Sequence, residues 1–427
     1  MSESTPADRD GTRRHGLSTR AIRAASRVPR VDQRPTSVPI YQTATFATAD
    51  AAELADVSTG ARSGFTYSRL DNPTVRALGD AFAELNGADD GLGVASGMAA
   101  IHLAFLSLLR AGDRLVIGDV GYGQTRVQAH STFERLGVEV VHVDTTDIDA
   151  VAAVLAARRT QVLHVETIAN PTAVVADLAA LADVAHRNGA VLTVDNTFAS
   201  PAVCRPLEHG ADLVVESATK YLAGHSDVMA GVVAGSAERM RVVRALQVDT
   251  GATLAPFSAF LVLRGIATFP VRVERQSRTA VALAGWLERQ PAVNAVIAPG
   301  LPSHPQASVV ARQLDSAGAM FSVDLAGGRD AGPAFIDALE IPERTASLGS
   351  VHTMVVHPPT TSHRALDDAA LAAAGITPGL LRVSVGLEDE ADLLADFASA
   401  LEAADLTVSR GERTGDAEPG AVPAGAR

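Results

Sequence analysis

This chain of 427 residues has one cysteine, one lysine and no long apolar run. The lack of cysteine and of apolar runs excludes several kinds of site and of protein. The single cysteine, Cys204, rules out an intrachain disulfide and a metal site built from several thiolates. The sequence has no apolar run that could cross a bilayer and no apolar signal segment at its start. We therefore expect a cytoplasmic protein that neither enters a membrane nor holds a metal.

Lysine is almost absent. Of the 36 lysine and arginine residues, only Lys220 is a lysine. A coding bias toward arginine can remove lysines from a surface, so the survival of Lys220 can be chance. However, only lysine can lose its proton and attack a carbonyl carbon, whereas a guanidinium stays charged and unreactive. The lone lysine therefore raises the hypothesis that a primary amine is required at this position.

Acidic residues outnumber basic ones, 49 against 36, and the formal net charge is −13. This balance argues against binding to nucleic acid or to an anionic membrane surface. With 47% apolar residues the chain can bury a large core, and its length predicts two domains. Residues 1–15 and about 408–427 are polar or rich in Gly, Pro and Ala, and we expect disordered tails there.

Between these ends, short apolar runs alternate with helical patterns. Runs typical of buried strands cover 91–95, 114–118, 138–143, 161–165, 190–194, 212–215 and 231–234, and helical patterns cover 98–110, 147–158 and 175–188. From about residue 256 long helices follow, and then a mixed segment over 321–401. The sequence therefore predicts an α/β fold whose mostly parallel sheet is covered by helices, with a smaller C-terminal α/β domain.

Polar residues gather where the predicted strands end, which is the edge at which open α/β sheets bind ligands. After successive strands come Gly97 and Met98 at a helix start, then Asn170, then Asp195, and finally Ser217, Thr219 and Lys220. A helix start presents free N–H groups that can bind a phosphate. Because a purely structural sheet has no reason to collect these groups at one edge, we predict a binding site there.

Pyridoxal phosphate (PLP) requires this combination of groups. Its aldehyde forms a Schiff base with an amine, its protonated pyridine ring needs a facing carboxylate, and its phosphate needs hydroxyls and N–H groups. Lys220 can supply the amine, Asp195 the carboxylate, and Ser217 and Thr219 the hydroxyls. The structural alternative for the last three is helix capping. The hypothesis is a PLP enzyme in which Lys220 acts as nucleophile and base.

Residues 217–231, Ser-Ala-Thr-Lys-Tyr-Leu-Ala-Gly-His-Ser-Asp-Val-Met-Ala-Gly, resemble the PLP-lysine signature of the Cys/Met-metabolism family. That family contains cystathionine γ-synthase, cystathionine γ-lyase, methionine γ-lyase and the homoserine-ester sulfhydrylases. Further segments match in the family's order, at 67–74, 96–99, 166–172, 194–201, 347–349 and 381–388. The resemblance covers about residues 17–405 and implies the type I fold of PLP-dependent transferases.

The resemblance also implies roles in binding the cofactor. Lys220 is expected to carry it, Asp195 to pair with its ring nitrogen, and Tyr122 to stack on the ring and take part in proton transfer. The expected phosphate contacts are Gly97, Met98, Ser217 and Thr219, joined by Tyr67 and Arg69 reaching from a neighbouring subunit. Taken singly, the two tyrosines can instead be core aromatics, and Arg69 can be a surface ion-pair residue.

For the substrate, the resemblance implies that Asn170, Ser347 and Arg382 hold the α-carboxylate of a small amino acid. The guanidinium fork of Arg382 suits a carboxylate, although a surface salt bridge is its alternative role. The family's assembly implies a homotetramer of two dimers with active sites at the dimer interfaces. The expected parts are a tail and arm toward the neighbour at 1–60, a PLP-binding domain at 61–255, a C-terminal domain at 256–407 and a tail at 408–427.

The implied reaction is γ-elimination or γ-replacement on a homoserine-, homocysteine- or methionine-type amino acid, as in transsulfuration. Two positions depart from the cystathionine-handling members. Val127 stands where those members have arginine, with Arg126 displaced by one, and Ala346 stands where they usually have glutamate. Both departures remove charge from the region that contacts the far end of the substrate. We therefore expect an uncharged distal group.

Other functions remain open at this point. One is cystathionine γ-synthase or γ-lyase proper, and another is a specialised γ-substitution that forms a C–C or C–N bond in secondary metabolism. Transamination or β-elimination is possible on the same fold, and a transaminase is distinguished by its need for a 2-oxo acid partner. A non-catalytic PLP-binding protein would be expected to lack the base or a cofactor anchor, and the sequence lacks neither.

Overall fold

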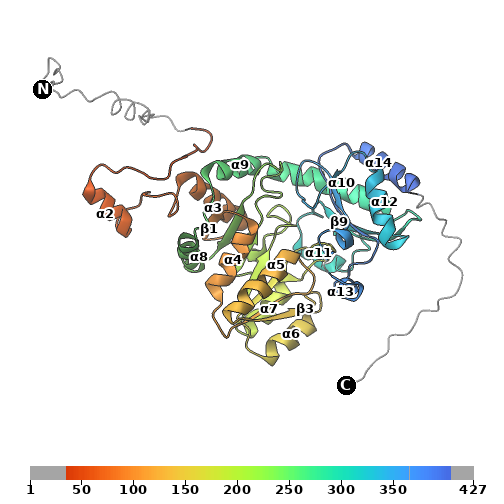
Figure 1. Ribbon diagram of the computed structural model, residues 1–427, viewed down its shortest axis with the longest axis horizontal. Helices are drawn as coiled ribbons and strands as arrows, with labels where there is room; N and C mark the ends of the chain where they lie inside the picture. The colour runs from red at the N-terminus through yellow and green to blue at the C-terminus, as the bar shows by residue number, and fades with distance from the viewer. Residues whose placement is uncertain (1–34, 365, 405–427) are drawn as a thin grey trace, which may run out of the picture. The chain divides into compact units, whose positions relative to one another are not determined.

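The computed structural model describes residues 35–364 and 366–404 (Figure 1). The tails predicted at 1–15 and 408–427 lie outside these residues, as does most of the predicted N-terminal arm. Contacts group the described residues from Ile40 onward into one compact unit, which holds two separate sheets. The domain boundaries proposed from the sequence stay a prediction.

A seven-stranded sheet forms the larger layer, with the strand order β1-β7-β6-β5-β4-β2-β3. Its strands are β1 (Asp90–Val94), β2 (Arg114–Gly118), β3 (Glu139–Val143), β4 (Val162–Glu166), β5 (Val191–Asp195), β6 (Leu213–Glu216) and β7 (Gly231–Gly235). Adjacent strands are parallel except at β7, which is antiparallel to both of its neighbours. The prediction of a mostly parallel sheet is therefore confirmed.

Helices cover both faces of this sheet because the strand side chains alternate between two apolar cores. Leu115 and Ile117 pack in one core and Val116 in the other. One core includes side chains from α4 (Gly97–Leu108) and α8 (Ala237–Thr250). The opposite core includes side chains from α3 (Pro73–Asn86), α6 (Ile148–Ala157), α7 (Leu178–Arg187) and α9 (Pro256–Ile266). Burial on both faces explains why the strands are continuously apolar.

The second sheet has five strands in the order β10-β11-β12-β9-β8. Its strands are β8 (Val293–Ile297), β9 (Met320–Leu325), β10 (Glu343–Arg344), β11 (Met354–Val356) and β12 (Leu380–Ser384). In Figure 1, α10 (Phe269–Leu287), α12 (Ala331–Ala338) and α14 (Glu390–Ala403) surround β9, and their side chains form a separate core with this sheet. The predicted smaller C-terminal α/β layer is thus present.

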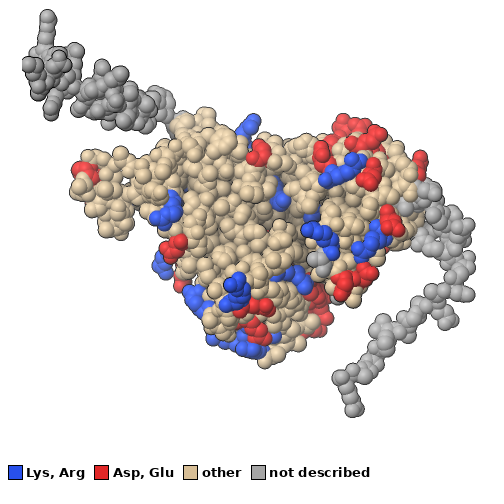
Figure 2. Space-filling model, viewed as in Figure 1, with Lys and Arg blue, Asp and Glu red and all other residues tan. Residues whose placement is uncertain are grey.

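Four shorter α-helices are also present among the described residues. They are α2 (Ala51–Thr59), α5 (Gly123–Gln128), α11 (Ala307–Gln313) and α13 (Asp368–Ala373), and a π-helical turn (Ala129–Phe133) extends α5. Over 35–364 and 366–404, no single helix has the length and apolar composition that a membrane crossing needs, although the pair α9–α10, bent by 59°, passes both criteria together. Figure 2 shows basic and acidic side chains intermixed over α6 and α7 and again over the C-terminal helices.

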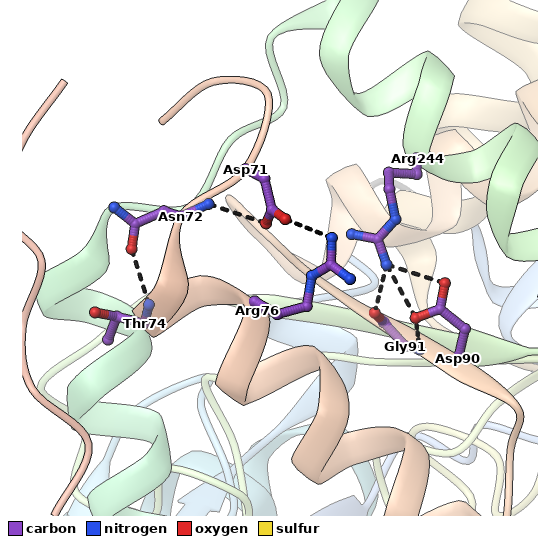
Figure 3. A network of polar contacts seen from close by, with 7 residues as sticks. All are labelled: Asp71, Asn72, Thr74, Arg76, Asp90, Gly91 and Arg244. Atoms are coloured by element: carbon purple, nitrogen blue, oxygen red, sulfur yellow. Dashed lines mark hydrogen bonds and ion pairs between the residues drawn. The ribbon is translucent and has the colours of Figure 1, made fainter. Parts of the chain in front are cut away.

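Two groups of polar contacts lie close together, one at the start of α3 and one between α8 and β1 (Figure 3). Asn72 caps α3 with its side-chain oxygen, and Arg76 pairs with Asp71 just before the helix. Arg244 of α8 donates to both carboxylate oxygens of Asp90 at 2.9 and 3.0 Å. The contacts of Asp71 and Asn72 order the segment just before α3, which carries the predicted contacts to a neighbouring subunit.

The loop after Lys220 is clamped by a buried guanidinium from α10. Arg272 donates to the backbone oxygens of Tyr221 at 3.0 Å and Gly265 at 2.9 Å. Gly224 has a left-handed backbone with φ of 76°, and a Cβ added there would lie 2.0 Å from the Arg272 Nη1 atom. Only glycine therefore combines this backbone conformation with the clamp.

We predict that Gly224→Ala destabilises the protein more than Gly87→Ala. Gly87 ends α3 in the same left-handed conformation, but no atom lies within 4 Å of an added Cβ. The control therefore loses only the backbone term of about 1–2 kcal/mol, whereas Gly224→Ala adds overpacking of about 1–3 kcal/mol against Arg272. Thermal unfolding of both variants measures the difference, and equal losses would contradict the clamp.

Candidate active site

A cavity of about 240 Å³ lies at the carboxyl ends of β4, β5 and β6. Nine residues predicted from the sequence line it: Gly97, Met98, Tyr122, Asn170, Asp195, Ser217, Thr219, Lys220 and Arg382. Ser347, predicted for the substrate carboxylate, contacts this group through Lys220. The structure therefore brings together side chains from both sheets at the edge that the strand-end argument indicated.

Lys220 is half-buried on the turn that follows β6. Its Nζ atom donates to the Ser347 Oγ atom at 2.9 Å. Burial, and secondly the positive charge of Arg382, lower the pKa of Lys220 from 10.5 to about 8. An amine with this pKa is partly unprotonated near neutral pH, as a nucleophile and base requires.

Asp195 ends β5 and faces the same cavity. Its Oδ1 atom accepts the Thr197 backbone N–H at 2.9 Å, and the Thr197 Oγ1 atom accepts the Ser217 N–H at 2.9 Å. Burial raises the pKa of Asp195, while its hydrogen bonds to Thr197 lower it. A turn rather than a helix follows Asp195, so helix capping does not explain this residue.

The predicted phosphate-binding site lies where α4 begins. Ser96 caps the helix by accepting the Ala99 N–H at 3.2 Å, and the first helical residue is Gly97. A Cβ added to Gly97 would lie 2.8 Å from the Ser217 Cβ, so glycine is what lets the helix start approach Ser217. Unpaired N–H groups of a first helical turn then lie beside a hydroxyl, which is a suitable arrangement for a phosphate. Thr219 lines the same end of the cavity but exchanges hydrogen bonds with the Ala230 backbone.

Arg382 of β12 is buried, with 4% of its surface exposed, so it is not a surface ion-pair residue. Its Nη1 atom donates to the Asn170 side-chain oxygen at 3.0 Å, and its Nη2 atom donates to the Ser347 backbone oxygen at 2.9 Å. Its Nε atom is buried without a protein partner among the described residues. Burial lowers the pKa of Arg382 to about 10, which still leaves it charged at neutral pH. A substrate carboxylate fits this cation.

The two predicted tyrosines are exposed rather than core residues. Tyr122 precedes α5, lines the cavity and is 42% exposed, and burial followed by the charge of Asp195 raises its pKa. Tyr67 is 44% exposed and does not line the cavity of its own chain, and neither does Arg69. The Arg69 guanidinium lies 5.7 Å from the centre of the Tyr67 ring and donates to the Val248 backbone oxygen at 3.0 Å.

Two glutamates of the site, the half-buried Glu166 and the buried Glu216, had no role in the sequence prediction. Glu166 ends β4, and its carboxyl oxygens accept the backbone N–H groups of Tyr122 and of Asn170, the latter at 2.8 Å. Glu216 ends β6 and accepts from the Asn196 side chain at 3.0 Å. Burial raises the pKa of both. The sequence could have indicated both, because each is the last residue of a strand that neighbours the strand of Asp195.

The two positions where the sequence departs from the cystathionine-handling members carry no charge. Ala346 lines the cavity and is exposed, and Val127 on α5 is 53% exposed. Arg126, displaced by one from the position that cystathionine-handling members fill with arginine, donates to the Asp119 backbone oxygen instead. Met229, 70% exposed, adds an apolar side chain to the cavity wall.

These groups fit PLP. The cavity holds an amine, a carboxylate for a ring nitrogen, a phosphate cradle at a helix start and a guanidinium with an unpaired buried N–H. Each belongs to a different loop or strand end, so the fit does not rest on one motif.

Comparisons with known proteins agree with the geometry. The chain is 42% identical to an O-succinylhomoserine sulfhydrylase of Pseudomonas aeruginosa, covering 91% of this chain and 95% of that protein. It is also 42% identical to an L-methionine gamma-lyase of Pseudomonas putida, covering 86% and 92%. A crystal structure of cystathionine gamma synthase from Xanthomonas oryzae pv. oryzae superposes with a TM-score of 0.82 at 37% identity, covering 87% of this chain and 94% of that one.

The structural likeness confirms the predicted fold of type I PLP-dependent enzymes. The sequence model for the Cys/Met metabolism PLP-dependent enzymes matches residues 18–402, close to the span over which the motifs were recognised. On these grounds, the chain belongs to the Cys/Met metabolism family of PLP-dependent enzymes.

Proposed function

We propose that this enzyme catalyses γ-elimination or γ-replacement on a homoserine-, homocysteine- or methionine-type amino acid with an uncharged distal group. One observation carries the proposal: the only lysine of the chain lies in one cavity with Asp195 and with the buried Arg382. A reacting amine, an acid for the ring nitrogen and a cation for the substrate carboxylate are thereby within reach of one small ligand.

The side chains divide the work between cofactor and proton transfer. PLP, when bound, supplies an aldehyde and an electron-withdrawing ring. Asp195 keeps a proton on the ring nitrogen, and Lys220 takes and returns protons of the substrate at its Nζ atom. Ser347 accepts a hydrogen bond from that atom at 2.9 Å and so holds the amine beside the substrate carboxylate site. Tyr122 lines the cavity and is proposed to assist proton transfer.

Substrate recognition has a charged end and a neutral end. Arg382 binds the α-carboxylate, and Asn170 orients its guanidinium. At the far end, Ala346, Val127 and Met229 offer no charge to a distal ammonium or carboxylate. This disfavours cystathionine, which carries both. Of the two relatives at 42% identity, the sulfhydrylase is named for a replacement reaction and the gamma-lyase for an elimination. Sequence identity therefore does not favour γ-replacement over γ-elimination.

We also propose that Tyr67 and Arg69 complete the phosphate site of a neighbouring subunit in a homotetramer. The two residues lie outside the cavity of their own chain, and Tyr67 is exposed, as an intersubunit contact requires. Residues 1–60 are proposed as the arm toward that neighbour. The expectation of a cytoplasmic protein stays a prediction.

The central experiment is borohydride reduction of the PLP-loaded protein. We expect one fixed cofactor adduct per chain, located by mass spectrometry at Lys220, and a yellow protein that loses its colour in Lys220→Ala. Turnover of O-acetylhomoserine, O-succinylhomoserine or methionine is expected to disappear with it, because the same amine is the base. A variant that kept its colour and its adduct would refute the assignment of Lys220.

Charge at position 346 is predicted to set substrate choice. Ala346→Glu places a carboxylate at the distal end of the cavity, whereas Ala346→Gln adds a similar volume without charge. We expect Ala346→Glu to raise the ratio of kcat/KM for cystathionine over methionine about fivefold relative to the Gln variant, as a partly exposed ion pair allows. Unaltered protein that already prefers cystathionine would contradict the neutral-group proposal.

The pKa of Lys220 predicts the pH dependence of cofactor uptake. Because only the unprotonated amine attacks the aldehyde, uptake by cofactor-free protein is expected to rise with pH around a midpoint near 8. In Arg382→Gln the midpoint moves upward, since a like charge is removed, but it stays below 10.5 because burial is the larger cause. The rate of colour formation after PLP addition, followed against pH, measures the midpoint in both proteins. A downward shift of the midpoint in Arg382→Gln would contradict the proposed effect of Arg382 on Lys220.

A further inference from the structure

Glu166 joins two parts of the active site through one carboxyl group. One oxygen accepts the backbone N–H of Tyr122, which directly precedes α5, and the other accepts the backbone N–H of Asn170 at 2.8 Å. Tyr122 follows β2 and Asn170 follows β4, so the two loops have no covalent reason to keep a fixed spacing. The two hydrogen bonds to the Glu166 carboxyl group hold these loops at a fixed spacing instead.

The packing around Glu166 leaves little room for it to move. A Cβ added to Gly121 would lie 2.9 Å from the Glu166 Oε1 atom. On the other side, Glu166 is the register neighbour of Asp195 in the parallel pair β4–β5, where adjacent strands lie about 4.8 Å apart. The side chain lines the cavity between the ring-facing acid and the Tyr122 turn.

Each loop carries a different function. Tyr122 lies where the cofactor ring is expected, and Asn170 accepts from Arg382 at 3.0 Å in the substrate carboxylate site. We propose that Glu166 is a positioning residue that fixes the ring-stacking tyrosine and the carboxylate-binding pair at one mutual spacing. This inference rests on the proposed function, because it takes the roles of both loops from there.

The chemistry of the side chain makes the proposal testable. A carboxyl group can accept at both of its oxygens, so it satisfies both backbone N–H groups, whereas a glutamine amide would place its NH₂ group against one of them. Glu166→Gln therefore loses one hydrogen bond and leaves a donor unpaired while the volume stays the same. Gly121→Ala is a second variant that displaces the carboxyl group without removing it.

Glu388 provides a matched control. Its Oε1 atom accepts the Thr353 backbone N–H and its Oε2 atom accepts the Thr353 hydroxyl, both at 2.6 Å. A hydroxyl can accept as well as donate, so glutamine is tolerated there. Glu388 does not line the cavity, and Glu388→Gln makes the same exchange of a carboxyl oxygen for an NH₂ group.

The test uses PLP-loaded protein and two binding readouts that need no turnover. Circular dichroism of the bound cofactor reports the ring and its contact with Tyr122. The affinity for L-norleucine, an amino acid without a γ leaving group, reports the carboxylate site. In Glu166→Gln and in Gly121→Ala we expect an altered cofactor dichroism together with an affinity weakened about tenfold. Glu388→Gln is expected to change neither.

Each combination of the two readouts supports or contradicts the positioning role of Glu166. If both readouts stay unchanged in Glu166→Gln, Glu166 has no positioning role, and if only one changes, it holds one loop and does not link two. Equal changes in Glu388→Gln would show a general loss of structure and overturn the proposal as well. Unaltered protein that bound PLP and norleucine but released no γ-substituent would refute the proposed reaction, while these two readouts would still decide the role of Glu166.

Discussion

The hydrogen bond from Arg382 to Asn170 is the constraint on which the site depends, because it connects the two sheets at the cavity. Arg382 belongs to β12 of the smaller sheet, and Asn170 follows β4 of the larger one. The Lys220–Ser347 hydrogen bond makes a second connection between the same layers. Gln276 of α10 supports both by donating to the backbone oxygens of Ser350 and Val385 at 2.7 and 3.0 Å. A site of this kind exists only while the two layers stay in register.

Removal from water shifts the acids and the base of this site in opposite directions. Burial lowers the pKa of Lys220 and raises the pKa values of Glu166, Asp195 and Glu216. The charged forms therefore become less favourable on both sides, and proton exchange at neutral pH becomes easier. Shifts of this kind at strand ends are typical of catalytic sites, whereas the ion pairs on the surface, such as Arg187 with Asp183, are solvated and contribute little.

Much of this arrangement could be predicted from the sequence because local patterns determine it. The run 114–118 forms β2 with the predicted bounds, since an apolar stretch between turns has few other uses in a parallel sheet. The strand at 161–165 is shifted by one residue, to Val162–Glu166, which places Glu166 in the strand. Helix α3 was missed although Asn72 and Pro73 are a recognisable start signal.

Contacts between distant residues could not be predicted by local reasoning. Arg382 and Asn170 are 212 positions apart, and Tyr122 and Glu166 are 44 apart. The family resemblance supplied Arg382 and Asn170, but nothing in residue spacing reveals that one carboxyl group receives two backbone donors. A backbone N–H group can donate whatever side chain its residue carries. The side chains of Tyr122 and Asn170 therefore do not reveal these two hydrogen bonds.

The half-buried position of Lys220 has a consequence for chemical damage. Every other basic side chain except histidine is an arginine, so the exterior carries positive charge without a single lysine ε-amine. Glycating sugars, acylating metabolites and aldehyde cross-linkers that seek such amines find only the one inside the cavity, where a bound cofactor occupies it. The loaded enzyme is thus shielded against reagents directed at lysine ε-amines, and the empty one has a single lysine that they can modify.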